Sequence, residues 1–400
     1  MQKRIMLAII LMMAGGGAAQ AFDMEDLEIH GFASTGYLRS TQNNYLLLSK
    51  EGSFEFNEAG LNVASSLTDN FRVGMQLFSR DQGEVGNNEV SVDWAFLDYQ
   101  RNEAFGIRVG RIKTPLGLAN ETRDYDMLRA SILLPQGTYN EYYREAAAAY
   151  QGAGLYGNVS LASAGRLRYD LYGGAMEVKT DGIMSKYIAN VNMEVTSVNV
   201  DRMAGGQLRW HTPLRGLMLG SSFVQLRMRL DSESTLQPMY TTLKMPEMRF
   251  LYFSTGYTNG GWDLEAEYHQ WKYDFSLDVD LSQLQQPNPP TLNDTVDREA
   301  YYVSLSYRFT DWLQTGAYYS VFYIDRRDHD GKGLVAQGSP DYAAWQKDLA
   351  LSLRFDLSDY WLIKLETHFM DGYALCDYSD NSDGFKQNWM LFAVKTTVNF

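Results

Sequence analysis

The C-terminal stretch 388-NWMLFAVKTTVNF-400 decides the fold, because apolar and polar side chains alternate along it. The apolar positions are Met390, Phe392, Val394, Thr396, Val398 and Phe400. The polar positions between them are Lys395, Thr397 and Asn399. Successive side chains of a β-strand point to opposite faces, so a period of two indicates a strand between two different surroundings.

The same alternation recurs along the chain and predicts sixteen strands. They lie near residues 27–38, 53–66, 71–80, 89–100, 105–112, 146–156, 165–175, 203–211, 217–229, 246–257, 261–273, 299–309, 312–324, 345–356, 360–370 and 388–400. A count of 14 or 18 stays open, because pattern alone does not fix every strand border.

The lengths of the links separate a membrane barrel from a soluble sandwich. Short links (LTDN, RNEA, TPLRG, TNGG, TD and LSDY) alternate with long ones near 39–52, 81–88, 113–145, 177–202, 230–245, 274–298, 325–344 and 371–387. A membrane barrel has short turns at its periplasmic rim and long loops outside, whereas a sandwich has no reason to sort its links this way. We therefore predict an all-β, antiparallel transmembrane β-barrel, with sixteen strands as the favoured count.

The N-terminus has the pattern of a secretory signal peptide, residues 1–21. Lys3 and Arg4 precede an apolar run, and Ala19-Gln20-Ala21 offers the small side chains of a cleavage site. A membrane anchor is the alternative, but it needs about 20 apolar residues, and the run breaks at Gly15. Residues 22–400 are then the exported barrel.

Composition excludes several function classes. The chain has 49 acidic and 35 basic side chains, a formal charge of -14, whereas nucleic-acid binding needs a basic surface. One cysteine, Cys376, and five histidines leave no intramolecular disulfide and little material for a zinc site. No serine and histidine form a convincing nucleophilic pair. We expect neither an enzyme nor a resident metal or cofactor.

Several segments resemble one family, the Gram-negative outer-membrane porins of the phosphate-selective and general-diffusion groups. The segments that carry this resemblance are LEIHGFASTGYL (27–38), FEFNEAGLNV (54–63), VGRIKTPLGLANETRD (109–124) and SILLPQGTYNEYYRE (131–145). The resemblance implies a trimeric, water-filled channel of sixteen strands whose third outside loop folds into the lumen. It also implies that the final Phe400 is part of the signal recognised by the outer-membrane assembly machinery.

Residues 113–145 form the longest link, and their composition suits the constriction that the resemblance implies. The segment is rich in leucine, which a purely solvated loop does not need. Its titratable residues are Lys113, Glu121, Arg123, Asp124, Asp126, Arg129, Glu141, Arg144 and Glu145. Such mixed signs suit a filter that sorts solutes by charge. The alternative is an outside loop packed on a neighbouring subunit.

Charge on the predicted lumen wall is uneven. The basic positions are Arg72, Arg108, Arg166, Arg168, Arg209, Arg227 and Arg229. The acidic positions, all on one later strand, are Asp263, Glu265 and Glu267. Neighbouring arginines repel one another unless water, acids or passing anions face them. We therefore expect a transverse field across the pore, the alternative being that each arginine is paired with a nearby acid.

These features predict a porin in the outer membrane of a Gram-negative bacterium, which lets small hydrophilic solutes diffuse through. A preference for anions is a hypothesis that rests on the arginines. The expected partners are outer-membrane lipid and lipopolysaccharide, the assembly machinery, and two further copies in a homotrimer. The alternative function is a structural or adhesion barrel whose lumen is closed by its own loops.

Overall fold

The computed structural model describes residues 27–83, 86–180, 188 and 191–400. The predicted signal peptide, residues 1–21, lies outside these described residues. In the described ranges, no helix combines the length and the apolar character needed to cross a bilayer.

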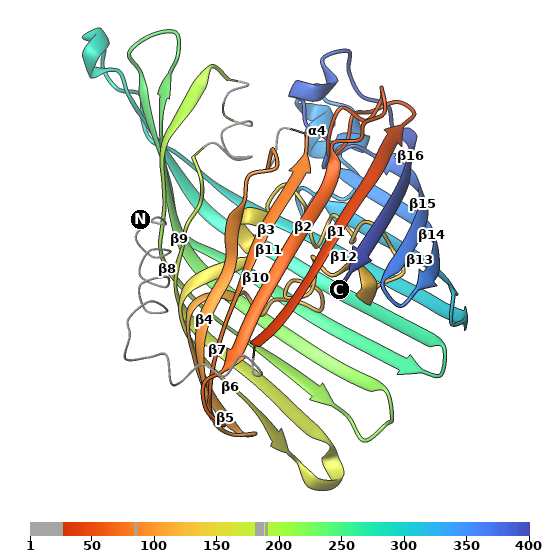
Figure 1. The fold of residues 1–400 in the computed structure, drawn as a ribbon. Coiled ribbons are helices and arrows are strands. Elements are labelled where there is room, and N and C mark those ends of the chain that lie inside the picture. Colours follow the sequence, from red (N-terminus) through yellow and green to blue (C-terminus); the bar gives the residue numbers. More distant parts are fainter. Residues whose placement is uncertain (1–26, 84–85, 181–187, 189–190) are drawn as a thin grey trace.

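In the described part of the chain, sixteen strands form one closed antiparallel barrel, as predicted (Figure 1). The strands are β1 (Leu27–Ser40), β2 (Phe56–Ser66), β3 (Phe71–Gln82), β4 (Ser91–Asn102), β5 (Phe105–Lys113), β6 (Ala149–Ser160), β7 (Arg166–Met176), β8 (Met193–His211), β9 (Leu217–Ser234), β10 (Tyr240–Asn259), β11 (Trp262–Asp280), β12 (Leu292–Thr310), β13 (Leu313–Tyr323), β14 (Trp345–Ser358), β15 (Trp361–Gly372) and β16 (Asn388–Asn399). Each strand pairs with the next, and β1 pairs with β16, so every described strand has a partner on both sides. Closure removes the unpaired edges that a sheet cannot expose to lipid.

Short helices occur only in the links between the described strands. They are η2 (Asp126–Leu128), α2 (Arg144–Ala147), η3 (Ala162–Ala164), η4 (Ser282–Leu284), α4 (Lys332–Ala336), η5 (Asp341–Ala343) and η6 (Ser379–Asn381). Two of them, η2 and α2, belong to the segment 113–145.

The strand β16 shows the two faces that the alternation predicts. Phe392 and Val398 point outward and are 41% and 47% exposed, whereas Lys395 and Thr397 point inward and are buried. Outward apolar side chains suit lipid, and the inward polar ones meet the lumen and the loops inside it.

Aromatic side chains beside the short turns are exposed on the outer face. These are Phe71, Phe105, Phe309, Trp312, Tyr360, Trp361 and Phe400, and such rings suit the headgroup depth of a bilayer. Tyr156 differs, because its hydroxyl donates a hydrogen bond to Asp98 at 2.8 Å and its ring lies 5.0 Å from the guanidinium of Arg108. Tyr156 therefore belongs to an inward polar cluster.

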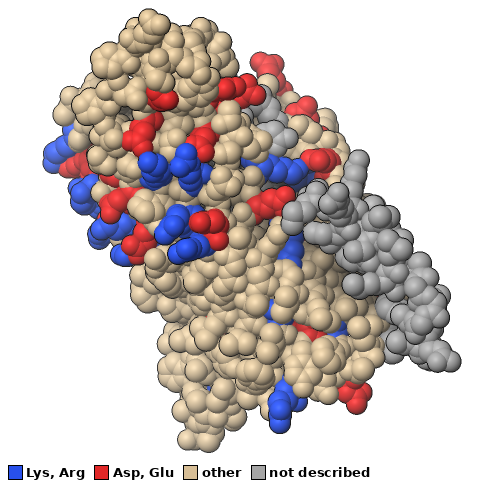
Figure 2. Space-filling model, turned by 90° about the vertical axis from the view of Figure 1, so that its left-hand side faces the viewer, with Lys and Arg blue, Asp and Glu red and all other residues tan. Residues whose placement is uncertain are grey.

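Strands β8 to β12 extend well beyond the predicted borders. The expected long loops 230–245 and 274–298 are largely strand, since β9 continues to Ser234 and β11 to Asp280. Figure 2 shows charged side chains gathered in a band across the upper part of this outer face, with the lower part mostly uncharged. Above the bilayer the outer face of a strand meets water, and its outward side chains there are polar. The alternation of apolar outward and polar inward residues, which predicts strands, therefore stops below the upper ends of these strands.

Three apolar clusters of the described residues fill parts of the barrel interior, and the smallest of them, Leu134, Tyr139 and Tyr302, joins the segment 113–145 to β12. The first joins the links after β1, β13 and β15 to the segment 113–145, and includes Tyr45, Ile132, Ala343, Cys376 and Trp389. The second lies inside β5 to β11. The first cluster therefore holds several extracellular links together on the β1 and β14 to β16 side.

Candidate solute pathway

The segment 113–145 lies against the inner wall of the barrel, where Glu267 of β11 is one of its anchors. The Glu267 carboxylate is buried and accepts hydrogen bonds from the Leu118 amide at 2.9 Å and the Tyr302 hydroxyl at 2.9 Å. The hydroxyl of Tyr139 also donates to it. Hydrogen bonds to a charged acceptor are the stronger kind. Glu267, predicted as a lumen acid, thus holds the segment in place.

A tight turn at Gly117 lets the segment approach the wall closely. Its φ of +59° suits glycine, and a Cβ there would lie 2.3 Å from the Tyr139 hydroxyl. The Gly117 carbonyl accepts hydrogen bonds from the side chains of Gln207 at 2.7 Å and Arg209 at 3.0 Å. The wall arginine Arg209 therefore also contacts this segment.

A second anchor is Asp126, whose buried carboxylate is surrounded by cations from two strands. Its oxygens lie 2.9 Å from Nζ of Lys395, 3.6 Å from Nζ of Lys364 and 3.1 Å from Arg129. The Thr397 hydroxyl donates to it at 2.8 Å. Asp126 and Arg129 were predicted as constriction residues, and both belong to this joint between the segment and β15 to β16.

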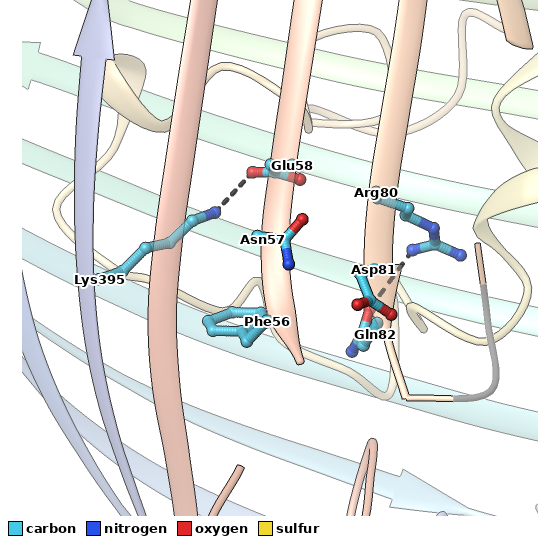
Figure 3. Close-up of a pocket in the computed structure, with 7 residues that line it drawn as sticks. All are labelled: Phe56, Asn57, Glu58, Arg80, Asp81, Gln82 and Lys395. Carbon is cyan, nitrogen blue, oxygen red and sulfur yellow. Dashed lines mark hydrogen bonds and ion pairs between the residues drawn. The ribbon is translucent and has the colours of Figure 1, made fainter. Parts of the chain in front are cut away.

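Figure 3 shows Lys395 reaching from β16 across β1 to Glu58 of β2, at 2.5 Å. Gly36 of β1 lies between them, and a Cβ there would stand 2.7 Å from the Phe56 ring. The space bounded here by Phe56, Glu58, Arg80 and Lys395 is only about 10 Å³, which is about one water molecule. This pocket is too small for a solute.

The two ends of the segment are tied to each other and to β4. Lys113, at its start, lies 2.5 Å from Asp93 and 2.5 Å from Asp124. Arg144, near its end, lies 2.6 Å from Asp124 and 3.4 Å from Asp93. Asp124 and Arg144 are both buried. This four-membered ion cluster closes the base of the segment.

A third ion cluster joins the segment to β3. Glu141 lies 2.9 Å from Arg123 and 3.1 Å from Arg80, and both arginines are buried. The structure thus divides the predicted constriction charges among three ion clusters: Lys113 and Asp124 lie in one, Asp126 and Arg129 in another, and Arg123 in the third. Each of these charges is paired within its cluster. The remaining predicted charge of this segment, Glu121, lies outside the three clusters.

Glu121 lies beside a cavity of about 380 Å³ near the short-turn ends of β7 to β11. Its carboxylate is 3.4 Å from Arg209 and 3.8 Å from Arg168. The residues that line the cavity are Leu118, Arg168, Arg209, His211, Gly216, Met218, Gly256, Thr258, Asp263 and Glu265. The lining therefore combines arginines of β7 and β8 with acids of β11.

The remaining arginines predicted for the wall have other surroundings. Arg72 forms an exposed ion pair with Glu28 at 3.0 Å, and Arg166 is exposed at the start of β7. Arg108 lies 3.1 Å from Asp98. Asp170 lies 3.1 Å from Arg168, and Asp231 lies 2.9 Å from Arg229. The alternative that each arginine has an acidic partner therefore describes Arg72, Arg108, Arg168, Arg209 and Arg229.

The expected place of Arg227 and Arg229 on the lumen wall is wrong. Both are exposed and alternate with Val224, Leu226 and Met228, which are buried inside the barrel. They stand on the part of β9 that extends above the uncharged band, so their polar face meets water outside.

Sequence reasoning missed several residues that position the segment. Glu366 of β15 accepts hydrogen bonds from the amides of Ile132 at 2.7 Å and Leu133 at 2.9 Å. Lys364 donates to the carbonyl of Ser131 at 2.9 Å. Glu366 and Lys364 occupy polar positions in the alternation along β15. This alternation is the only signal in the sequence for a role inside the barrel. Their partners lie more than 200 residues away in the chain.

A closed barrel with an apolar outer band, a polar inner wall and an inward segment defines the class of outer-membrane channels. The family model described as phosphate-selective porin O and P matches residues 39–346, so the chain belongs to this porin family. It is an outer-membrane diffusion channel of a Gram-negative bacterium and not an enzyme. No match to a curated protein was found.

Solved structures of porins share the fold. OmpF of Salmonella typhi is 13% identical with a TM-score of 0.57, over 95% of this chain and 99% of that chain. OmpT of Vibrio cholerae is 13% identical with a TM-score of 0.55, over 94% and 97%. An anion-selective porin from Comamonas acidovorans is 12% identical with a TM-score of 0.54, over 94% and 99%. At these identities the likeness concerns the fold.

Proposed function

We propose that small hydrophilic solutes pass through the cavity beside β7 to β11, that residues 113–145 narrow this path, and that anions are preferred. The observation that carries the proposal is the lining of the cavity. Arg168 and Arg209 stand on one side, and Asp263 and Glu265 stand on the other. The lumen-facing charges are thus separated by sign across one water-accessible space.

The arginine side supports a preference for anions. Arg168 and Arg209 are direct partners in the register of β7 and β8, so two permanent cations lie side by side. Acids offset part of their charge: Asp170 lies 3.1 Å from Arg168, and Glu121 lies 3.4 Å from Arg209 and 3.8 Å from Arg168. Opposed charges across a narrow aqueous path orient dipolar solutes and concentrate one sign of ion. The phosphate-selective character of the family and the anion selectivity of the similar porin from Comamonas acidovorans support the same preference.

The test is the reversal potential in a salt gradient across a planar bilayer. Replacing Arg168 and Arg209 by Ala lowers the anion-to-cation permeability ratio several-fold if these side chains face passing ions. The matched control replaces Arg227 and Arg229, which are exposed on the outer face, and leaves the ratio unchanged. An unchanged ratio in the Arg168 and Arg209 variant contradicts the proposal.

A barrel closed by its own loops is the second candidate function. It is favoured by the apolar cluster that joins the links after β1, β13 and β15 to the segment 113–145. Bilayer recordings of the pure, folded protein separate the two functions. Stepwise conductance supports the channel, and its absence supports a structural or adhesion role.

We propose further that the chain assembles as a homotrimer. One of the similar structures, 12% identical with a TM-score of 0.51, is a trimer form of OmpT from Vibrio cholerae. Mass measurement of the detergent-solubilised protein tests this proposal. A trimer that dissociates on heating is the expected result, and a monomer before heating contradicts it.

Lipopolysaccharide is the proposed partner of the charged outer band in Figure 2. The outward basic residues of the extended strands are Arg202, Arg227, Arg229, Lys244, Arg249 and Lys272. Phosphate groups bind such side chains through charge-assisted hydrogen bonds. Less lipopolysaccharide should co-purify after Arg227, Arg229 and Arg249 are replaced by Ala than after Arg327 and Lys332 of another link are replaced.

The C-terminal Phe400 is proposed as part of the assembly signal. Its backbone pairs with Gly31 of β1 through two hydrogen bonds of 3.0 Å, and its side chain is 66% exposed. An exposed ring is open to recognition before the barrel closes. Phe400→Ala should lower the amount of folded protein in the outer membrane without lowering its synthesis.

A further inference from the structure

A row of aromatic side chains covers the inward face of β10 and β11 above Glu267. Its members are Phe250, Tyr252, His269, Trp271, Tyr273 and Phe275. On β11 the outward positions between them are polar: Gln270, Lys272 and Asp274. We call this set the aromatic track. It starts toward the extracellular ends of the two strands and descends to the level where Glu267 holds the segment 113–145.

The rings of the track form a continuous series across the two strands. Tyr252 and His269 are stacked at 4.2 Å and 13°, and Phe250 and Trp271 at 5.4 Å and 22°. Trp271 continues to Tyr273 at 5.7 Å. Phe250, Trp271, Tyr273 and Phe275 are only partly buried. These rings pack in part against the second apolar cluster, and Tyr143 of the segment 113–145 meets the Trp271 ring edge-on at 5.6 Å. Only the remainder of their aromatic surface is exposed inside the barrel.

A cation without a carboxylate partner stands beside the middle of the track. Arg298 of β12 is the register partner of Trp271, and its guanidinium lies 4.9 Å from the centre of that ring. Among the described residues, no carboxylate lies within ion-pair distance of Arg298. The other wall arginines discussed above, Arg108 and Arg209, each have one. The charge of Arg298 is thus not offset by a direct acidic partner.

We propose that the aromatic track binds solutes that carry an aromatic ring and a carboxylate on the extracellular side of the segment 113–145. The proposal rests on the channel function and specifies a solute class for it. The ring of the solute stacks on Phe250, Trp271 or Tyr273, and Arg298 pairs with its carboxylate. Stacking and cation pairing act together here because Arg298 lies over Trp271.

An aromatic carboxylate fits the track better than a neutral sugar does. A sugar also stacks on rings, but its hydroxyl groups need several hydrogen-bonding side chains around them. The inward positions of the track are mostly Phe, Trp and Tyr, and the one histidine, His269, is only 6% exposed. The unpaired Arg298 instead offers a single strong site for an anion.

The position of the track places the bound solute on the extracellular side of the segment 113–145. Its lower end, His269, is followed on the same inward face of β11 by Glu267. Glu267 is buried where it holds the segment 113–145. The track is therefore a binding site above this contact.

The experiment measures the ion current through single channels in a planar bilayer while benzoate is added on the extracellular side. The wild-type current should fall in a saturable way. Trp271→Ala and Arg298→Gln should each raise the half-saturating concentration about three- to tenfold, the range expected for loss of one stacking or cation contact. Phe253→Ala is the matched control, because Phe253 lies on β10 but is exposed on the outer face, and it should cause no change.

Two comparison solutes and one direct binding measurement make the result decisive. Equal block by cyclohexanecarboxylate overturns the role of aromatic stacking, and equal block by maltose overturns the solute class. Ligand-observed NMR with benzoate and the folded protein in detergent reports binding without conduction. Conduction without benzoate binding overturns the track alone. Binding that depends on Trp271 in a protein without conductance overturns the channel function instead, and heat-modifiable migration on gels confirms that each variant is folded.

Discussion

At the scale of single residues, the buried carboxylates of the segment 113–145 do most to hold it in place. Asp126→Asn leaves Lys364 and Lys395, both buried, without their shared counter-charge. Removing one partner from a buried ion cluster costs about 3–5 kcal/mol. We therefore expect that loss in the free energy of unfolding, measured with guanidinium chloride in detergent.

The control for this prediction is Asp383→Asn. Asp383 also pairs with a lysine, Lys50, at 2.6 Å, but the Asp383 side chain is 66% exposed and the Lys50 side chain is 30% exposed. Lys50 lowers the pKa of the Asp383 carboxyl, yet surface ion pairs contribute little to stability. A loss in the Asp126 variant no greater than in this control would argue against Asp126 as an anchor.

The single cysteine tests how tightly the extracellular links pack. Cys376 is buried in the cluster with Tyr45, Tyr373 and Trp389, and burial raises the pKa of its thiol. Thiol reagents attack the thiolate, so a raised pKa and lack of access both slow the reaction. We expect Cys376 to label with a maleimide far more slowly in the folded protein than in the denatured protein at pH 7 to 8. Equal rates would mean that this cluster opens readily.

At the scale of elements, a row of glycines lets the backbones of β5, β6 and β7 approach one another closely. Gly110, Gly152 and Gly174 are successive register partners. A Cβ on Gly152 would stand 2.1 Å from the Gly173 carbonyl oxygen and 2.8 Å from Cα of Gly174. These are backbone atoms, which cannot move aside without disturbing the strand pairing. Gly152→Ala should therefore destabilise the barrel by about 1–3 kcal/mol, as overpacking does elsewhere.

Gly173→Ala is the matched control for that prediction. Gly173 is the neighbour of Gly174 on β7, and a Cβ there would meet only the Met203 carbonyl oxygen, at 3.6 Å. Chemical denaturation of both variants gives the comparison. If Gly173→Ala is as harmful as Gly152→Ala, general strand propensity and not close approach explains the glycine row.

The strands also show how much of the fold can be predicted from the sequence. Alternation and link length suffice to predict the barrel, because β1 to β7 and β13 to β16 keep lipid on one face over most of their length. The same two signals do not predict the upper ends of β8 to β11, because the outer face meets water there instead of lipid. Arg227, for example, is exposed on this outer face. The anchors Glu366 and Lys364 escape prediction for another reason. Their partners Ile132 and Ser131 become neighbours only when the barrel closes. A single sequence carries no local pattern that shows such a distant contact.

At the scale of the whole molecule, the interior has two unlike sides. Near β15, β16, β1 and β2, the segment 113–145 is fixed by Asp126, and the pocket beside Lys395 holds about 10 Å³. Near β7 to β11, the cavity holds about 380 Å³. Ion-pair anchors and apolar packing leave little space on the first side. The second side also holds an apolar cluster and the Glu267 anchor, but it keeps the larger cavity, which is why we propose the solute path there.

The outer surface should show a sharp change from lipid to water along β10. Phe253 is exposed on the outer face, whereas Arg249, four residues up the same face, belongs to the charged band. Four strand residues span about 13 Å. A spin label at position 253 should collide mainly with oxygen dissolved in lipid, and one at position 249 mainly with a water-soluble nickel chelate. The buried Cys376 leaves these labels without competition, and equal nickel accessibility at both positions would place the bilayer lower on the barrel than the uncharged band in Figure 2 indicates.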